Sequence, residues 1–594
     1  MTRPLPELTR GQDAASERSR RREMRVDNGW TTVWQTRVMR RRLLRGGVLG
    51  VTAVGAAWLV ACGGGKNEQQ GGSSGQAART GSATTTGNLN ATLRSGIGSD
   101  VGSMDPQSLA GTGGGNWPNY TTHFITPLAI DPETSEVKPY AVEWKWVDNN
   151  TALLLTVKPG VKFHNAEILS AEQLKFNFER ELGRAEYNPQ FKSGHASQFT
   201  AVGDLTVVDE YNLRIGLREP DVVLPTRIAN TLYLVPKNYV STVGDTEFAA
   251  KPVGSGPFKF VSRTVDSEIR SERFDDFFNP RDGQYDPRLP FIKSLVQRVI
   301  PEDTARSGAL ERGEIDLAHN MSADLAKQFE GRSGFKVFYL PGDQPMHIHI
   351  NTVAERDPSS GQPNPWRDVR VRKAANMAID LDTIIKTILT GKEQVSFGPA
   401  QRSFGFPQDI KNQRFRYDPQ GAKQLLVQAG YPDGFETPFS YPIGRWPNTE
   451  QVVQAIAGYL AKVGIRSKIL AKQYQVVTTE FKTRGNYGLT FWGMSGGPDP
   501  GPNFRYGYHS TGAYTLSYDP TLGLDALIEQ SEREFDANRR KQMIGEIIRK
   551  FYQNASWIFL YEPVTVVIAR DHIEWTPYQK VLSNPEYWNI KVTS

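Results

Sequence analysis

The sequence predicts an α/β protein whose main sheet is largely parallel. Residues 437–492 alternate between strand and helix patterns, which is the order expected of βαβ units. Glycine, proline and aspartate gather where the predicted strands meet the predicted helices. With 594 residues, of which 38% are hydrophobic and 23% are charged, the chain has enough apolar material for more than one lobe.

The segment 437–492 justifies the α/β class element by element. A strand at 439–441 is followed by a helix with one apolar face, which ends at Gly464. Residues 465–470 predict a second strand, 476–483 a second helix and 487–492 a third strand. In sheets of this kind ligands bind beyond the carboxyl ends of the strands.

Other elements carry clear start and stop signals. Residues 153–157 predict a strand, and residues 207–217 predict a hairpin that turns at 209–212. Ser170 and Gln173 form a capping-box pair ahead of a helix. Asp418 as the cap and Pro419 at the first position mark the start of a later helix.

The N-terminal region predicts an export signal. Four arginines within residues 40–45 precede an apolar run from 46 to 61, which is too short for a bilayer-spanning helix. The run ends in Leu59-Val60-Ala61-Cys62, which resembles a lipobox whose cysteine accepts a diacylglyceryl group. We therefore predict a signal peptide at 1–61, with a weak twin-arginine pattern, and a lipidated Cys62 followed by a flexible tether at 62–88. The alternative is a plain anchor or signal with an incidental cysteine.

The basic character of the chain belongs to this N-terminal region. Residues 1–61 hold twelve arginines and five acidic residues, while the rest of the chain has 58 basic and 59 acidic residues. A neutral body does not indicate a phosphate-binding stripe, so we expect no nucleic-acid partner.

Five sequence blocks resemble the family 5 extracytoplasmic solute-binding proteins, the oligopeptide, dipeptide and nickel-binding group of ABC importers. All five are dense in residues with special backbone geometry, and they stand in the order typical of that family. They are 157–165 (VKPGVKFHN), 252–258 (PVGSGPF), 313–316 (GEID), 366–380 (WRDVRVRKAANMAID), and 417–419 (YDP) with 429–435 (AGYPDGF).

The resemblance implies a two-lobed periplasmic-binding-protein-like fold of type II, with an extra lobe inserted in the first lobe. Lobe one would comprise about 88–127, 250–345 and 564–594, the inserted lobe about 128–249, and lobe two about 346–563. The implied function is non-catalytic: a monomer captures a small solute, such as a peptide or an oligosaccharide, between its lobes. It delivers this solute to ABC permease subunits at the outer side of the cytoplasmic membrane or in the periplasm. No cofactor is expected, and no Walker A pattern is present.

The same resemblance places the ligand loop after the strand that ends at Trp492. Peptide-binding members carry Trp-x-x-Asp there, and the aspartate pairs with the α-ammonium of the peptide. In this chain the corresponding position is Ser495, and Asp499 comes one residue later than the usual Asp-Pro of the family. We expect Trp492, Ser495 and Asp499 to face the ligand, with free-amine peptides binding poorly and a neutral oligosaccharide binding better by stacking on Trp492 and Trp117.

Further ligand contacts are expected from Asn116, Trp117 and Tyr120 in a glycine-rich loop, and from Tyr561 at the return crossing. A rim aromatic packed on a neighbouring lobe is an equal alternative for the loop, and a core tyrosine is the alternative for Tyr561.

A secreted serine hydrolase is the rival function. Residues 493–497 match G-x-S-x-G around Ser495, and His509 and His572 lie downstream. The nucleophile elbow needs a helix directly after the serine, whereas three prolines follow within residues 498–502. His347 and His349 alternate on one strand face, but no third ligand accompanies them, so we expect no metal site.

Overall fold

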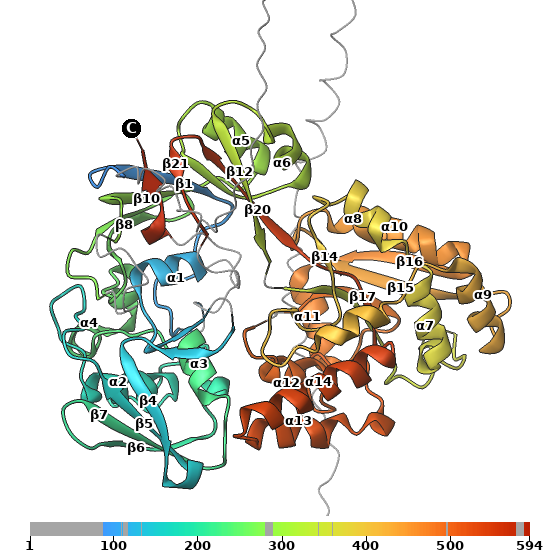
Figure 1. Ribbon diagram of the computed structural model, residues 1–594, viewed down its shortest axis with the longest axis horizontal. Helices are drawn as coiled ribbons and strands as arrows, with labels where there is room; N and C mark the ends of the chain where they lie inside the picture. Colours follow the sequence, from blue (N-terminus) through green and yellow to red (C-terminus); the bar gives the residue numbers. More distant parts are fainter. Residues whose placement is uncertain are drawn as a thin grey trace, which may run out of the picture. The chain divides into compact units, whose positions relative to one another are not determined.

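A computed structural model describes residues 87–108, 110, 117–131, 134–278, 289–342, 344–358, 360–494, 497–577 and 587–593. All of them belong to the unit Ser82–Ser594. The predicted signal peptide, Cys62 and nearly all of the tether lie outside the described residues. Three sheets of four or more strands organise the described part of the chain (Figure 1). None of its helices is both long and apolar enough to cross a membrane.

A seven-stranded sheet forms the first lobe, with the order β12-β20-β11-β1-β10-β9-β8. Its central strand β1 runs parallel to both neighbours, and the outer pairs are antiparallel. Alternate residues of β20 pack into two different cores, which shows that both faces of this sheet are covered. The strands are β1 (Thr92–Ile97), β8 (Phe258–Thr264), β9 (Glu268–Arg273), β10 (Ser294–Val299), β11 (Leu317–Met321), β12 (Phe335–Pro341) and β20 (Val564–Arg570). Its helices are α1 (Trp117–His123), α5 (Asp303–Glu311) and α6 (Ala323–Phe329), and a small hairpin joins β21 (Ile573–Glu574) and β22 (Lys591–Val592).

The chain leaves this sheet after β1 and returns at β8, and the inserted lobe lies between these two points. This lobe is an antiparallel sheet of order β4-β5-β7-β6 with its own hydrophobic core. Its elements are β2 (Leu128–Ile130), β3 (Val137–Pro139), β4 (Val142–Val147), β5 (Ala152–Val157), β6 (Val202–Val207), β7 (Asn212–Leu217), α2 (Ala171–Glu181), α3 (Leu224–Thr231) and α4 (Lys237–Ala250).

The predicted capping box of α2 forms only by half. Ser170 caps the helix by accepting a hydrogen bond from the backbone N–H of Gln173. The side chain of Gln173 does not reach back, because its amide donates to Glu167 and its oxygen accepts from the N–H of Lys237. Residues outside the helix cap therefore bind both polar groups of the side chain that the local sequence assigns to the cap.

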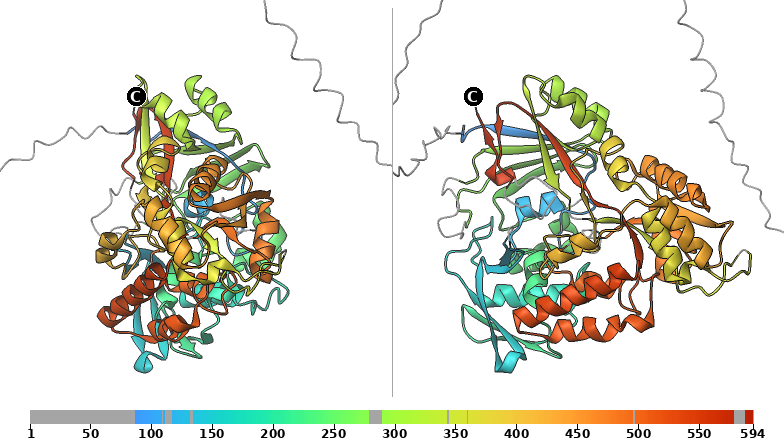
Figure 2. Two further views of the ribbon diagram at one scale, coloured as in Figure 1. Left: turned by 90° about the vertical axis from the view of Figure 1, so that its right-hand side faces the viewer. Right: turned by 45° about the vertical axis from the view of Figure 1, so that its right-hand side comes forward.

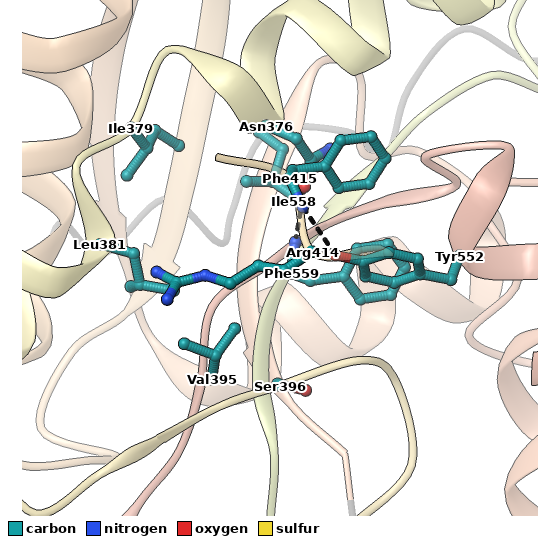
Figure 3. A pocket seen from close by; sticks show the side chains of 10 residues that line it. All are labelled: Asn376, Ile379, Leu381, Val395, Ser396, Arg414, Phe415, Tyr552, Ile558 and Phe559. Carbon is teal, nitrogen blue, oxygen red and sulfur yellow. Dashed lines mark hydrogen bonds between the residues drawn. The ribbon is translucent and has the colours of Figure 1, made fainter. Parts of the chain in front are cut away.

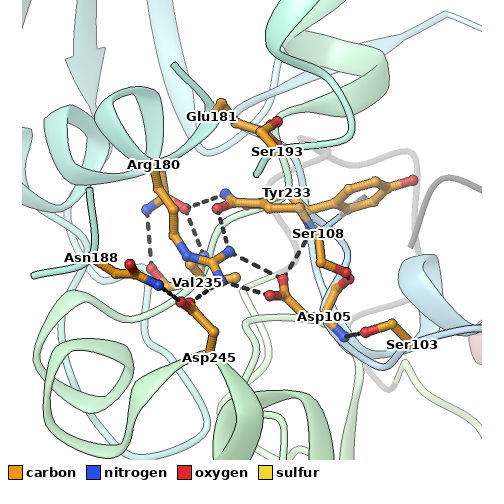
Figure 4. A network of polar contacts seen from close by, with 12 residues as sticks. Ser103, Asp105, Ser108, Arg180, Glu181, Asn188, Ser193, Tyr233, Val235 and Asp245 are labelled. Atoms are coloured by element: carbon orange, nitrogen blue, oxygen red, sulfur yellow. Dashed lines mark hydrogen bonds and ion pairs between the residues drawn. The ribbon is translucent and has the colours of Figure 1, made fainter. Parts of the chain in front are cut away.

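A buried ion network fastens the inserted lobe to the segment that follows β1 (Figure 4). The guanidinium of Arg180, in α2, makes two hydrogen bonds of 3.1 and 2.6 Å to the carboxylate of Asp105. It also donates to Asp245 of α4 at 2.7 Å, to Gln107 at 2.8 Å and to the Tyr187 hydroxyl at 2.6 Å. Arg180 is 0% exposed and Asp105 is 1% exposed, so the network replaces the water that both charges lose.

The second lobe is built on a five-stranded sheet of order β16-β15-β17-β13-β18. β15 runs parallel to both β16 and β17, and helices follow β15 and β16, as the βαβ pattern predicts. The strands are β13 (Met346–Ile350), β15 (Phe435–Pro442), β16 (Ile465–Lys472), β17 (Leu489–Gly493) and β18 (Trp557–Phe559). The helices are α7 (Val369–Met377), α8 (Leu381–Thr387), α9 (Pro419–Gln428), α10 (Thr449–Lys462), α11 (Tyr474–Thr483), α12 (Gly501–Gly507), α13 (Leu524–Arg533) and α14 (Ala537–Gln553).

Two segments cross between the first and second sheets. One joins β12 to β13, and the other joins β18 to β20 through β19 (Tyr561–Glu562), which pairs with β14 (Gln394–Val395). The crossings touch where the N–H of Gly342 donates to the carbonyl of Pro563 at 2.7 Å. A Cβ on Gly342 would lie 2.7 Å from the Pro563 ring and 2.8 Å from its carbonyl oxygen. Only glycine therefore allows this approach.

We expect Gly342→Ala to destabilise the protein by about 1–3 kcal/mol, because two backbones must separate to admit the methyl group. Gly458→Ala in α10 is the matched control, since no heavy atom lies within 4 Å of the position of its Cβ. That change should stabilise by about 0.4–1 kcal/mol through the entropy of the unfolded chain. Urea unfolding measures both variants, and equal effects at the two positions would contradict the close crossing.

Candidate functional site

Three parallel strand ends bring aromatic residues together at one edge of the second-lobe sheet. Trp446 follows β15, Tyr474 begins α11 directly after β16, and Trp492 lies near the end of β17. The ring centroids of Trp446 and Tyr474 lie 5.6 and 5.5 Å from that of Trp492. This is the carboxyl edge, where ligands bind in α/β sheets.

Trp492 itself is covered in this structure. It is 5% exposed, and the rings of Tyr474 and Tyr514 lie within 5° and 27° of parallel to it. Phe481 meets it edge-on at 4.9 Å. A sugar ring can stack on Trp492 only if one of these tyrosines moves. The half-buried rings of Trp446, Tyr474 and Tyr514 present the accessible side of this cluster.

Arg445 adds a positive charge to the aromatic edge. Its guanidinium carbon lies 5.3 Å from the ring of Trp446 and 5.4 Å from the ring of Tyr474. Its Nε is buried and has no hydrogen-bond partner. No ion pair joins Arg445 to any carboxylate in the part of the chain that the structure describes. A guanidinium on aromatic faces presents its in-plane N–H groups to an acceptor such as a carboxylate.

Sequence reasoning missed Arg445, although a signal was available. The strand at 439–441 was predicted, and Gly444-Arg445-Trp446 follows its carboxyl end. The rule that ligands bind beyond strand ends applies to this strand as it does to the strand of Trp492.

Asp499 follows Trp492 by seven residues in the sequence and already has a cationic partner. Its carboxylate forms two hydrogen bonds with the guanidinium of Arg540, at 2.6 and 2.8 Å, and accepts a third from the N–H of Gly501. Burial alone would raise the pKa of Asp499, but the Arg540 charge outweighs it and holds the pKa below its ordinary value. The charge of this carboxylate is therefore balanced without a ligand.

Ser495 lies outside the described residues, but its surroundings bear on the hydrolase alternative. Residues 497–500 are not helical, and α12 begins only at Gly501, so no helix follows the serine directly. The Nδ1 of His509 lies 2.9 Å from the Thr511 hydroxyl, and its Nε2 lies 3.4 Å from Glu529. His572 lies 3.5 Å from Asp316 in the first lobe. Both imidazoles therefore have polar partners of their own among the described residues.

The glycine-rich loop contributes one residue whose side chain can be placed. Asn116 lies outside the described residues, and of Trp117 only the backbone at the start of α1 is described. Tyr120 is 3% exposed, donates its hydroxyl proton to the carbonyl of Ser103 at 2.8 Å, and packs on Tyr233. Its side chain thus fills a small aromatic core in this structure.

Tyr561 lies on the return crossing, as expected, in β19. It is 4% exposed and packs in the core of the second lobe, and its backbone pairs with Val395 of β14. Burial raises its pKa above the ordinary value of a tyrosine. In this structure Tyr561 is a core tyrosine of the second lobe.

His347 and His349 form a buried pair on β13. Their Nε2 atoms lie 2.9 Å apart, and the ring of His347 stacks on Trp557 at 3.8 Å. Burial lowers the pKa of both rings, that of His349 to about 3. Among the described residues, no group of three or more possible ligands is placed to hold a metal ion. We interpret the pair as part of the sheet core.

These histidines should make stability depend on pH. Both folded-state pKa values lie below the 6.5 of a free imidazole. Below that pH the two imidazoles are therefore protonated in the unfolded chain but stay neutral in the folded chain. Stability should therefore fall on acidification below about pH 6.5, by about 1.4 kcal/mol per pH unit for each imidazole. Urea unfolding at several pH values between 7 and 5 measures the slope. In the double variant His347→Gln/His349→Gln, the slope of unfolding free energy against pH should lose the contribution of about two protons. An unchanged slope would contradict the buried neutral pair.

A separate pocket lies within the second lobe (Figure 3). It holds about 320 Å³ of space, part of it open to solvent, between α7, α14 and β18. Its polar groups already have partners: Asn376 accepts from the N–H of Phe559, Tyr552 accepts from the N–H of Phe415, and Arg414 pairs with Asp382. A pocket whose polar groups already have partners is a poor candidate for recognition.

Comparison with known proteins identifies the family of this chain. Residues 137–515 match the model of the bacterial extracellular solute-binding proteins, family 5. The glutathione-binding protein GsiB of Pectobacterium atrosepticum is 24% identical over 69% of this chain and 78% of its own length. The oligopeptide-binding protein AppA of Bacillus subtilis is 23% identical over 75% of this chain and 82% of its own length.

Among solved structures, the periplasmic binding protein DppA of Helicobacter pylori, in complex with the peptide STSA, superposes with a TM-score of 0.69. It is 23% identical, and the match covers 85% of this chain and 99% of that protein. The predicted fold class, a type II periplasmic-binding-protein-like α/β fold, is confirmed. The matched relatives are transport proteins that bind solutes rather than enzymes. The chain belongs to the family 5 extracellular solute-binding proteins of ABC importers.

Proposed function

We propose that this protein is an exported lipoprotein that captures a small acidic solute between its lobes and delivers it to the permease of an ABC importer. The accessible rings of Trp446, Tyr474 and Tyr514 hold the flat or apolar part of the solute. The guanidinium of Arg445 binds its carboxylate. The position of Arg445 is the observation that carries the proposal, because a cation enclosed by closing lobes needs an anion.

The acidic solute proposed here differs from the neutral oligosaccharide that the sequence alone predicts. Tyr474 and Tyr514 occupy the positions beside Trp492 where a sugar ring was expected to stack, and a neutral oligosaccharide would leave Arg445 unpaired. We still expect peptides with a free α-ammonium to bind poorly, because position 495 is a serine and Asp499 is paired with Arg540. We therefore favour a carboxylic acid without a free α-ammonium, such as an N-blocked peptide or a related amide-linked acid.

Mass spectrometry of the solute that co-purifies with the protein tests this proposal directly. Calorimetry should then compare a panel of short peptides in free and N-acetylated forms with gluco-, xylo- and manno-oligosaccharides. We expect the N-acetylated peptides to bind more tightly than the free ones, and the sugars to bind weakly. Sub-micromolar binding of a free peptide that N-acetylation abolishes would show that an acid holds its amine and would overturn the proposal.

The lipid anchor has its own test. Cys62→Ala removes the only cysteine of the chain and with it the only thiol that can accept a diacylglyceryl group. We expect the variant to lose labelling by radioactive fatty acid and to move from the detergent phase to the aqueous phase. Ser73→Ala in the predicted tether is the control and should stay anchored. Normal labelling of the Cys62→Ala protein would rule out the lipoprotein assignment.

A further inference from the structure

The inserted lobe contacts the second lobe at a place remote in sequence from both crossings (Figure 2). The backbone N–H of Val222 donates to the carbonyl of Glu532, at the end of α13, at 3.1 Å. The ring of Trp146, in β4, meets Phe535 edge-on with 4.9 Å between centroids. Glu219 and Arg533 approach to 3.9 Å at the exposed margin.

Val223 shows that this contact excludes water. Its side chain is 0% exposed, yet it is not a member of the hydrophobic core of the inserted lobe, whereas its neighbour Leu224 is. Its Cγ2 lies 3.5 Å from the position of a Cβ on Gly501, at the start of α12. The second lobe therefore contributes to burying Val223.

Two ion pairs face each other across the same contact. Asp221 pairs with Arg227 in the inserted lobe, and Asp499 pairs with Arg540 in the second lobe. The charge of Arg227 acts on the carboxyl of Asp499, and that of Asp221 acts on the guanidinium of Arg540. The four charges sum to zero, so their joint burial leaves no net charge without a partner.

Asp499 also places the contact next to the ligand loop. Residues 493–499 run from the aromatic edge at Trp492 to the Asp499–Arg540 pair, so six residues separate the two sites. The contact therefore lies close in sequence to the strand end that carries Trp492.

We propose that the inserted lobe is a latch: Trp146 and residues 219–223 dock on α12, α13 and the residues before α14, and this contact stabilises the closed clamp. The proposal rests on the clamp function described above and assigns the inserted lobe a part in it. Asp499 then acts as a positioning residue for closure and not as a contact to the amine of a solute.

A charge placed in the latch tests the proposal. Val223→Asp would put a carboxylate beside Gly501, where Asp499 and Arg540 already balance each other, so the closed clamp would enclose one negative charge without a counter-ion; when the lobes separate, that charge would lie in water. The ratio of closed to open molecules should fall at least about a hundredfold. Val208→Asp is the matched control, because Val208 lies in the same lobe and is 58% exposed. It should leave the ratio unchanged.

The distance between the lobes is the readout. Spin labels on Gln190→Cys and Gln542→Cys, in a full-length Cys62→Ser background, report it by pulsed electron resonance without any added solute. Phe535→Ala removes the Trp146 contact from the side of the second lobe, so it leaves the inserted lobe intact. It should lower the closed ratio about tenfold.

A longer distance population in Val223→Asp and Phe535→Ala, but not in Val208→Asp, supports the latch. Identical distance distributions in all four proteins overturn it. Because the measurement needs no solute, it can fail while solute capture succeeds, and the two proposals can be judged separately.

Discussion

Arg445→Gln is expected to weaken binding of the co-purified acidic solute by about thirtyfold to several thousandfold. Removing one partner of a buried, hydrogen-bonded charge pair costs about 2–5 kcal/mol, because the other charge stays enclosed without its counter-ion. The loss should be smallest for a solute whose carboxylate has been amidated, since that solute never pairs with the guanidinium. Calorimetry with the acid and its amide measures the loss of affinity for each.

Arg466→Gln is the matched control for this prediction. Arg466 lies on β16 of the same sheet, but its side chain is 54% exposed and its Nη1 donates to the carbonyl of Asp433. We expect its affinity for the acid to stay within about a factor of two of the original protein. If Arg445→Gln and Arg466→Gln behave alike, the aromatic edge does not bind an acid.

Arg180→Met is expected to destabilise the inserted lobe by about 3–5 kcal/mol. Methionine fills much of the same volume, but it leaves the carboxylates of Asp105 and Asp245 without the cation that balances them. The side chain of Asp105 is 2.6 Å from the guanidinium and cannot reach bulk water. Urea unfolding followed by circular dichroism should show an earlier transition.

Lys175→Met tests whether the loss of any cation from α2 destabilises the inserted lobe as much as Arg180→Met does. Lys175 pairs with Glu179 at 3.7 Å on the partly exposed side of the helix, where such pairs contribute about 0.3–0.5 kcal/mol. The variant should unfold close to the midpoint of the original protein. An unchanged midpoint in Arg180→Met as well would mean that the buried network contributes little to the fold.

Local patterns in the sequence were sufficient for the fold class and for many element ends. The βαβ order of 437–492, the cap at Asp418 and the hairpin at 209–212 all appear in the structure. Each depends on residues within a few positions of one another, through helix and strand periodicity, caps and turns. Such signals do not need the rest of the chain, so the sequence carries them directly.

The tertiary structure decided which side chains come into contact and which charged groups keep no ionic partner. The sequence presents Asp499 as a ligand candidate and Arg445 as one arginine among many, yet the fold pairs the first with Arg540 and sets the second on two aromatic rings. Asp499 and Arg540 are 41 residues apart, and the rings beside Arg445 come from the ends of neighbouring strands. Periodicity and capping act over a few residues, whereas the balance of charge in a buried site depends on partners that only folding brings within 4 Å.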